Sequence, residues 1–192
     1  MTPSPAPVIP APGKRLRADA RRNRERILKA ARWVFAHEGL HTQIDDVAKR
    51  AKVGVGTVYR HFPTKEALLD AVVRERFDEI AGYAREALER DDAWEGFCEL
   101  IWRAAERNAE DLGFCGAVAS TDCSAIVEET GLMASTVELI ERAKAQGRMR
   151  LDATEDDVPL MMVGASAVMQ LNPGEEIWRR YFTLMLDGLR AS

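Results

Sequence analysis

The segment TQIDDVAKRAKVGVGTVYRHFPTKEALL, residues 42–69, decides the fold, because short helical patterns in it alternate with residues that end helices. Apolar residues at helical spacing predict a helix over residues 44–51. Gly54 then serves as a turn residue or an N-cap for a second short helix, which runs to about Phe62 before Pro63 ends it. Two short helices joined by a tight turn are typical of a helix-turn-helix.

A longer helix is predicted on each side of this pair. Upstream, an apolar stripe runs through the basic segment of residues 14–38, and Gly39 ends it. Downstream, Thr64 opens a long fourth helix. Between them, we expect Thr42 and Asp45 to form a capping box, in which their side chains accept hydrogen bonds from exposed backbone N–H groups.

Charge is distributed unevenly along the chain, whose net charge is −4. Residues 1–65 contain 14 Lys and Arg against 5 Asp and Glu, whereas residues 66–192 contain 13 against 26. A basic N-terminal part on an acidic remainder is expected when one small domain meets a polyanion and the other does not. The sequence therefore favours nucleic acid as the partner of the N-terminal part.

Composition excludes several classes of protein. Charged residues make up 30% of the chain, and no apolar run approaches the roughly 20 residues of a membrane span. The first residues are rich in proline and lack the basic start of a secretory signal, so we expect a disordered lead over residues 1–15 and a cytoplasmic protein. Three cysteines without a CxxC pair, and the lack of a nucleophile elbow, a phosphate loop or a metal-ligand cluster, predict no metal, no cofactor and no enzymatic activity.

The second helix of the helix-turn-helix is the one expected to enter the major groove of double-stranded DNA. Gly56 allows close approach, Val55 can touch a thymine methyl group, and Thr57 can reach a base edge or a phosphate. This helix lacks Asn and Gln, so specificity leans on Gln43, on DNA shape and on the basic arm that includes Arg21. The residues placed for phosphate contacts are Tyr59, Arg60, His61 and Lys65.

This segment resembles the DNA-binding signature of the TetR family of transcriptional regulators, and the resemblance covers residues 20–70. The capping Thr, the Val-Ala pair, the Gly turn, the Tyr-x-His-Phe run and the Thr-Lys-Glu start of the fourth helix all occur in register. The resemblance implies an all-α, homodimeric repressor of about nine helices, which binds a pseudo-palindromic operator and releases it when its C-terminal domain binds a small molecule. By position, it implies DNA contacts from Thr42, Gly54, Val55, Gly56, Thr57, Tyr59, His61 and Lys65.

We expect a DNA-binding domain over residues 16–65 and a helical ligand-binding and dimerisation domain over residues 66–192. Pro159 either delays the start of the penultimate helix or kinks it. After the long fourth helix, we expect one helix that begins after Asp92. Three more are expected over about residues 124–146, 155–170 and 175–190.

The last two helices are apolar on too many sides for ordinary surface helices, so they need a partner besides the core of their own subunit. A two-fold dimer interface is the economical explanation, because the small Gly164 and Ala165 let another helix come close. The residues expected in this interface are Met161, Gly164, Ala165, Val168, Trp178, Tyr181 and Met185.

Aromatic and methionine side chains are numerous in the C-terminal part, as in helical domains that adapt to apolar ligands. We expect a small, largely apolar effector in a pocket lined by Trp94, Phe97, Trp102, Phe114, Met133 and Met162. Two alternatives remain open. One is a thiol-based redox sensor acting through Cys115 or Cys123, and the other is a DNA-binding protein whose C-terminal part only dimerises.

Overall fold

The computed structural model describes residues 12–110, 123–171 and 174–191 of the chain. Within these residues the regular structure consists of nine helices, besides one isolated β-bridge between Met149 and Arg190. The prediction of an all-α fold is therefore confirmed. In chain order the helices are α1 (Pro12–Glu38), α2 (Ile44–Ala51), α3 (Val55–His61), α4 (Lys65–Leu88), α5 (Ala93–Ala109), α7 (Ser124–Thr130), α8 (Leu132–Ala145), α9 (Asp157–Leu171) and α10 (Glu175–Gly188).

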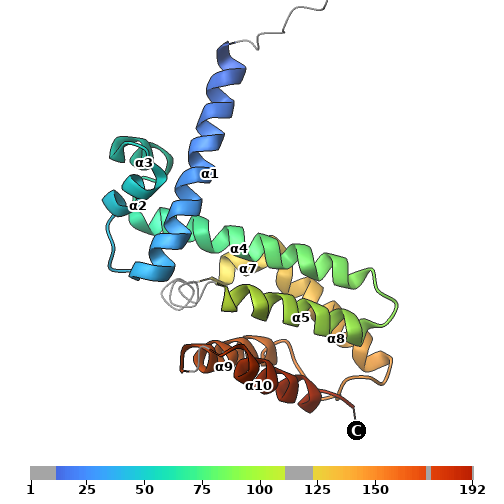
Figure 1. Ribbon diagram of the computed structural model, residues 1–192. Helices are drawn as coiled ribbons and strands as arrows, with labels where there is room; N and C mark the ends of the chain where they lie inside the picture. Colours follow the sequence, from blue (N-terminus) through green and yellow to red (C-terminus); the bar gives the residue numbers. More distant parts are fainter. Residues whose placement is uncertain (1–11, 111–122, 172–173, 192) are drawn as a thin grey trace, which may run out of the picture.

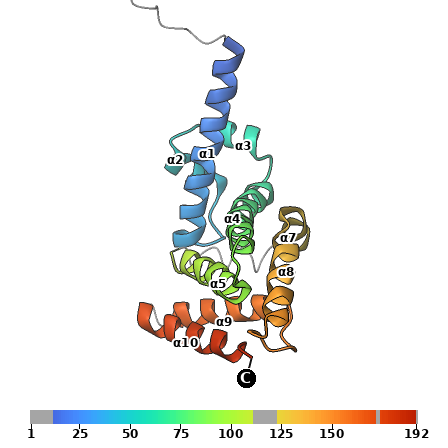
Figure 2. The same cartoon turned by 90° about the vertical axis from the view of Figure 1, so that its right-hand side faces the viewer.

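The helices form a small N-terminal unit and a larger C-terminal one, each with its own apolar core. Val34, Val47 and Val58 are among the residues buried in the first core, where α1, α2 and α3 meet. Trp94 and Phe97 are buried in the second, which α4, α5, α8, α9 and α10 surround. Figure 1 shows α9 and α10 beneath α4 and α5, and Figure 2 shows α7 and α8 along one side of that stack.

Helix α4 belongs to both units. Its first turns bury Leu68 and Val72 in the N-terminal core, and its later turns bury Ile80 and Ala84 in the C-terminal core. The domain boundary expected between residues 65 and 66 therefore falls at the start of a helix that both cores share.

Helix α1 is longer than the sequence predicted. It begins at Pro12, so residues 12–15 are helical, although we expected them in the disordered lead. Proline suits the first position of a helix, because the N–H group that it lacks has no partner there. Residues 1–11 lie outside the described residues.

The cap of α2 lies one residue further along the chain than predicted. Gln43, and not Thr42, is the N-cap, and its backbone N–H donates to the carboxylate of Asp46 over 3.0 Å. The predicted box of Thr42 and Asp45 is therefore wrong. Two adjacent aspartates follow Ile44, and either could have accepted this bond, so the sequence did not determine the register.

The helix expected over residues 124–146 is divided in two. Gly131 takes a left-handed conformation with φ 72°, which ends α7 and caps the start of α8. Glycine adopts this conformation without the steric cost that a Cβ atom brings. Further along, α9 begins only at Asp157, whose carboxylate accepts from the N–H of Thr154 over 2.8 Å. Pro159 thus lies in the first turn of α9. Of the two expected alternatives, a delayed start and a kink, the delayed start is the one observed.

Candidate nucleic-acid interface

Helix α3 is held by one side of its short length and leaves the other side outward. Among its seven residues only Val58 is buried, and Phe62 follows as a buried C-cap. Tyr59 is 48% exposed, and Arg60 and Gly56 are exposed beside it. The polar side chains expected to meet DNA thus share the face that the core does not use.

The two glycines of this face are not required by the fold. Gly54, the N-cap of α3, has a φ of −69°, which any residue can adopt. A Cβ atom on Gly56 would meet nothing within 4 Å among the described residues, and one on Gly54 would meet only the Thr57 hydroxyl at 3.9 Å. Their lack of a side chain therefore leaves room for something outside the subunit.

Two of the predicted DNA contacts use their polar atoms inside the unit. Thr42 is 7% exposed, and its hydroxyl donates to the Gly39 carbonyl over 2.8 Å. The Lys65 ammonium donates to the Leu40 carbonyl, which fixes the α1–α2 loop to the start of α4. Gln43, in contrast, is exposed at the start of α2.

The remaining predicted contacts are half-buried on α3 or lie on α1. His61 is half-buried next to Phe62, with ring centroids 6.3 Å apart, and Val55 and Thr57 are also half-buried. Arg21 lies on α1 with a side chain that is 75% exposed, 3.6 Å from the carboxylate of Glu25.

Two arginines of α1 hold the helix-turn-helix in place, and sequence reasoning did not assign this role. One terminal nitrogen of Arg26, Nη2, donates to the carbonyls of Ala51 and Lys52 over 2.6 and 3.1 Å. The guanidinium of Arg24 lies 5.4 Å from the centre of the Phe62 ring. The sequence placed Arg24 in the basic arm and gave Arg26 no role, because no sequence signal reveals a backbone carbonyl as a partner.

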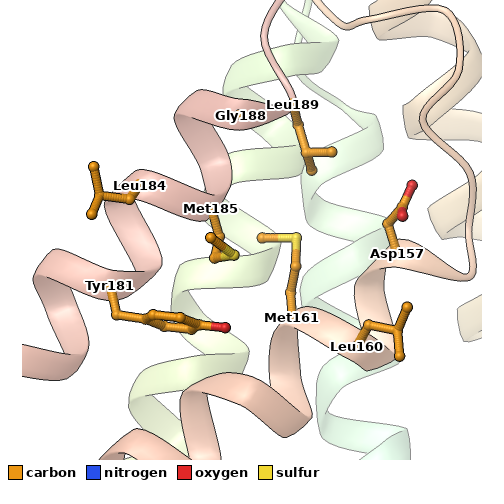
Figure 3. A pocket seen from close by; sticks show the side chains of 8 residues that line it. All are labelled: Asp157, Leu160, Met161, Tyr181, Leu184, Met185, Gly188 and Leu189. Carbon is orange, nitrogen blue, oxygen red and sulfur yellow. The ribbon is translucent and has the colours of Figure 1, made fainter.

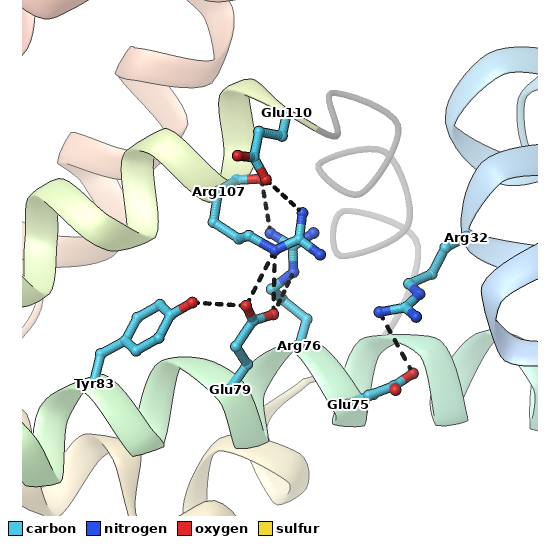
Figure 4. A network of polar contacts seen from close by, with 7 residues as sticks. All are labelled: Arg32, Glu75, Arg76, Glu79, Tyr83, Arg107 and Glu110. Atoms are coloured by element: carbon cyan, nitrogen blue, oxygen red, sulfur yellow. Dashed lines mark hydrogen bonds and ion pairs between the residues drawn. The ribbon is translucent and has the colours of Figure 1, made fainter. Parts of the chain in front are cut away.

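A polar network connects α4 with the end of α5 where the two units meet. Figure 4 shows the Glu79 carboxylate between Tyr83, whose hydroxyl donates to it over 2.6 Å, and Arg107, whose Nε lies 3.2 Å away. Arg76 is 3% exposed and donates to the Arg107 carbonyl over 2.9 Å.

The charges of this network keep Glu79 ionised. Partial burial opposes its negative charge, but the hydrogen bond from Tyr83 and the charges of Arg107 and Arg76 outweigh burial and lower the pKa of Glu79. In the same region, Arg32 of α1 lies 3.8 Å from Glu75 of α4. A charged contact thus joins α1 to α4 beside the apolar packing of the N-terminal core.

The predicted pocket residues are spread over the C-terminal unit. Trp94 and Phe97 are 2% and 0% exposed, and the Trp102 ring packs edge-on against Phe182 with centroids 5.0 Å apart. Met162 is half-buried against the same core, whereas Met133 is 38% exposed on α8. Phe114 lies outside the described residues. The structure brings most of this set to one core, and the pocket stays a prediction.

The outward face of α9 and α10 is formed largely by residues that we did not name. Three of the expected interface residues, Met161, Ala165 and Trp178, are at most 6% exposed inside the subunit. Gly164 also faces inward, because a Cβ atom there would clash with the Tyr181 hydroxyl of α10. The large apolar residues exposed on these helices are Leu160, Val163, Leu171, Ile177 and Leu184.

A groove of about 360 Å³ runs along this face. Figure 3 shows Met161 and Met185 at its centre, with Tyr181 below them and Leu160 and Leu184 at its sides. Val168 is half-buried on α9 outside the groove lining. A helix that is apolar all round gives no periodic signal to tell its inward from its outward side, so the sequence could not show which residues of α9 and α10 face outward. The dimer interface on these helices stays a prediction.

The cysteines within the described residues are only partly exposed. Burial raises the pKa of the Cys98 thiol to about 11, so this thiol stays protonated and unreactive near neutral pH. Cys123 is half-buried just before α7, and Cys115 lies outside the described residues.

Among the residues described, no helix is both long and apolar enough to cross a membrane.

A helix-turn-helix joined by a shared helix to an all-helical C-terminal unit defines a class of DNA-binding regulators. Residues 27–72 match the tetR family of bacterial regulatory proteins, and residues 91–191 match the C-terminal domain of SbtR-like transcriptional regulators. The chain belongs to the TetR family of transcriptional regulators. This membership agrees with the prediction that it is not an enzyme.

Individual relatives support the same membership. A TetR transcription regulatory protein from Mycobacterium vanbaalenii is 34% identical, with a TM-score of 0.64, over 92% of this chain and 99% of its own. The regulator UidR of Escherichia coli K12 is 33% identical over 75 residues, which span 38% of each chain. FadR from Bacillus subtilis, solved in complex with stearoyl-CoA, is 18% identical over 85% of this chain and 95% of its own, with a TM-score of 0.70. The last likeness shows the fold alone.

Proposed function

We propose that this protein is a dimeric repressor that occupies a pseudo-palindromic DNA operator and leaves it when a small, largely apolar effector binds its C-terminal unit. The observation that carries the proposal is the outward face of α3. It combines exposed Tyr59 and Arg60 with two glycines that the fold does not need.

This face suits the major groove. With no side chain at Gly56, the backbone of α3 can approach base edges, while Tyr59 and Arg60 reach phosphates on the strand beside it. The excess of basic residues in the first 65 residues supplies the long-range attraction to a polyanion. UidR, which is 33% identical over 75 residues, is an HTH-type transcriptional regulator.

A second copy of the chain is the partner proposed for α9 and α10. Leu160 and Leu184 are 70% and 56% exposed on one apolar face, which is more than isolated surface residues explain. A two-fold axis through this face would place two α3 helices on the same side of the DNA, in successive turns of the major groove.

The apolar nature of the effector is supported by the composition of the C-terminal core. Trp94, Phe97, Trp102 and Phe182 lie within it or against it, and few polar side chains are buried beside them. FadR, which shares the fold, has been solved with a fatty acyl thioester bound. Binding to one conformation of the C-terminal unit would shift the equilibrium away from the DNA-bound one.

Titration of the purified protein with the DNA that flanks its own coding region tests the proposal. The measurement is made at two salt concentrations with a scrambled duplex as competitor. We expect saturable binding of two chains per site that resists the scrambled duplex. Equal affinity for both duplexes, lost for both as salt increases, would contradict a specific operator.

The dimer is tested separately by sedimentation of Leu184→Asp, which places a charge on the proposed interface. We expect this variant to be monomeric and to bind the operator weakly, because one chain cannot hold both half-sites. Leu151→Asp is the matched control, since Leu151 is 82% exposed on a loop outside α9 and α10. If Leu184→Asp sediments as the wild-type protein does, the interface lies elsewhere.

A further inference from the structure

Each connection between the helices of the N-terminal unit is held by a cationic side chain. Lys65 donates to the Leu40 carbonyl in the α1–α2 loop, and Arg26 donates to the Ala51 and Lys52 carbonyls in the α2–α3 turn. At the end of α3, the Arg24 guanidinium lies over the ring of Phe62. Part of the basic charge of this unit therefore makes contacts within the unit, although Arg24 and Arg26 remain exposed.

The Arg26 contact is the one closest to the start of α3. Ala51 is the last residue of α2, and Lys52 is its C-cap in a left-handed conformation with φ 55°. Carbonyls at the end of a helix have no partner within the helix, so they need donors from elsewhere. Arg26 supplies one nitrogen to both carbonyls, and the N-cap of α3, Gly54, follows two residues later.

Besides this bond, the turn is held by apolar contacts, because Val53 and Val55 pack partly buried against the N-terminal core. The N–H groups of Lys52 and Val53 bond back to α2, which closes the end of that helix but does not fix its angle to α1. Val58 is the one residue of α3 that is buried in the core. The bond from α1 to the turn is thus the polar contact that relates the start of α3 to the longest helix of the unit.

We propose that Arg26 is a positioning residue for DNA recognition, which orients α3 through the α2–α3 turn and does not itself bind a phosphate. This proposal rests on the proposed function, because it concerns the same DNA-binding face. A phosphate contact and a positioning contact have different consequences. Loss of a phosphate contact weakens binding to every sequence and lowers the salt dependence, whereas misplacement of α3 weakens only the specific complex.

The test compares Arg26→Gln with Lys29→Gln. Lys29 is exposed one turn further along α1, so both variants lose one positive charge from the same helix. Affinities for the operator and for a scrambled duplex are measured over a series of salt concentrations. Hydrogen exchange of the backbone amides of residues 52–58 is measured on the same proteins without DNA.

We expect Arg26→Gln to bind the operator at least tenfold more weakly than Lys29→Gln, since a hydrogen-bonded charge is lost. We expect the two variants to bind the scrambled duplex equally and to share one salt dependence. Amides of residues 52–58 should exchange faster in Arg26→Gln alone. A fall in the slope of log K against log salt by about one relative to Lys29→Gln, with both duplexes weakened alike, would overturn the proposal in favour of a phosphate contact.

Two further arms keep the test decisive. If Arg26→Gln does not fold, Arg26→Lys takes its place and is compared with the wild-type protein, because it retains the charge but not the planar guanidinium. We then expect weaker operator binding and faster exchange at residues 52–58, with binding to the scrambled duplex unchanged, and wild-type operator affinity would overturn the proposal. If the wild-type protein shows no specific DNA binding, the proposed function fails. The exchange comparison then still decides the structural part of the proposal, and unchanged exchange at residues 52–58 would refute it.

Discussion

Replacement of Gly56 by alanine separates the stability of the protein from its affinity for DNA. Gly56 is the second residue of α3, it is exposed, and its backbone has no positive φ. A methyl group there would touch none of the described atoms within 4 Å. Alanine is favoured over glycine in a helix by about 0.5–1 kcal/mol. Because Gly56 lies in the first turn, we expect the lower value, about 0.5 kcal/mol of added stability.

The same methyl group is expected to weaken the complex with DNA. If the backbone of α3 lies against base edges at Gly56, one added carbon overfills a packed interface, which costs about 1–3 kcal/mol. Since 1.4 kcal/mol corresponds to a factor of ten, operator affinity should fall by roughly 5- to 150-fold. For a chain of this size, the gain in stability should raise the melting temperature by about 1–2 °C.

Calorimetry and operator titration on the same preparations check both expectations. Gly82→Ala is the matched control, since Gly82 is within α4 and a Cβ atom there would only make an ordinary contact of 3.9 Å with Arg85. The control should gain stability and keep full affinity. Wild-type affinity in Gly56→Ala would refute the reasoning, because the α3 backbone would then not approach the DNA at this residue.

Three other substitutions test individual features of the fold. Gly96→Ala should destabilise the protein by about 1–3 kcal/mol in urea unfolding, because the added Cβ atom would lie 2.6 Å from the Ala87 carbonyl oxygen. A neutral result would mean that α4 and α5 separate easily. Lys52→Gly should stabilise the protein by up to about 0.5 kcal/mol in urea unfolding, because relief of the left-handed strain exceeds the entropy cost of glycine. A measured loss of stability would contradict this expectation. Cys98 should react slowly with iodoacetamide at pH 8 and faster towards pH 11. The raised pKa of the Cys98 thiol also makes the stability of the protein depend on pH. The stabilising contribution of the protonated thiol is complete below about pH 9, the ordinary thiol pKa, and is lost between about pH 9 and about pH 11. Cys98→Ala should not show this loss.

Local patterns predicted the helix-turn-helix well because its signals lie within a few residues of one another. Gly54 as the N-cap of α3, Pro63 after its end and Thr64 as the cap of α4 all occur as the sequence indicated. Thr64 accepts from the N–H of Ala67 over 3.1 Å. The resemblance to the TetR family rested on the same segment, and the family matches cover residues 27–72 and 91–191.

The errors arose where the sequence permits two arrangements of similar energy. Gly131 can continue a helix at a small cost or end it with a positive φ, and the packing of α7 against α4 decides between these. Asp45 and Asp46 can each serve the cap of α2, and the choice depends on where the preceding loop ends. Neither tertiary contact is visible in a local pattern.

The roles of several polar residues could not be predicted for a different reason. The partners of Arg26 and Lys65 are backbone carbonyls, and every residue in the chain carries one. The outward side of α9 was equally hidden, since Leu160 and Met161 are adjacent, both apolar, and only one of them is exposed. Such choices are made by three-dimensional neighbours and not by residue type.

The continuous course of α4 through both cores fixes how the two units are rotated about its axis. Successive residues of a helix are turned by about 100°, so Val72 and Ile80 face their separate cores at a relative angle set by the seven residues between them. Insertion of a single residue within α4 between Val73 and Phe77 would turn α3 by about 100° relative to the C-terminal core, and it would also separate Val73 from Phe77 in the cluster around Ile126. Under the proposed function, the number of residues in this helix therefore helps to set how two α3 helices meet the DNA site.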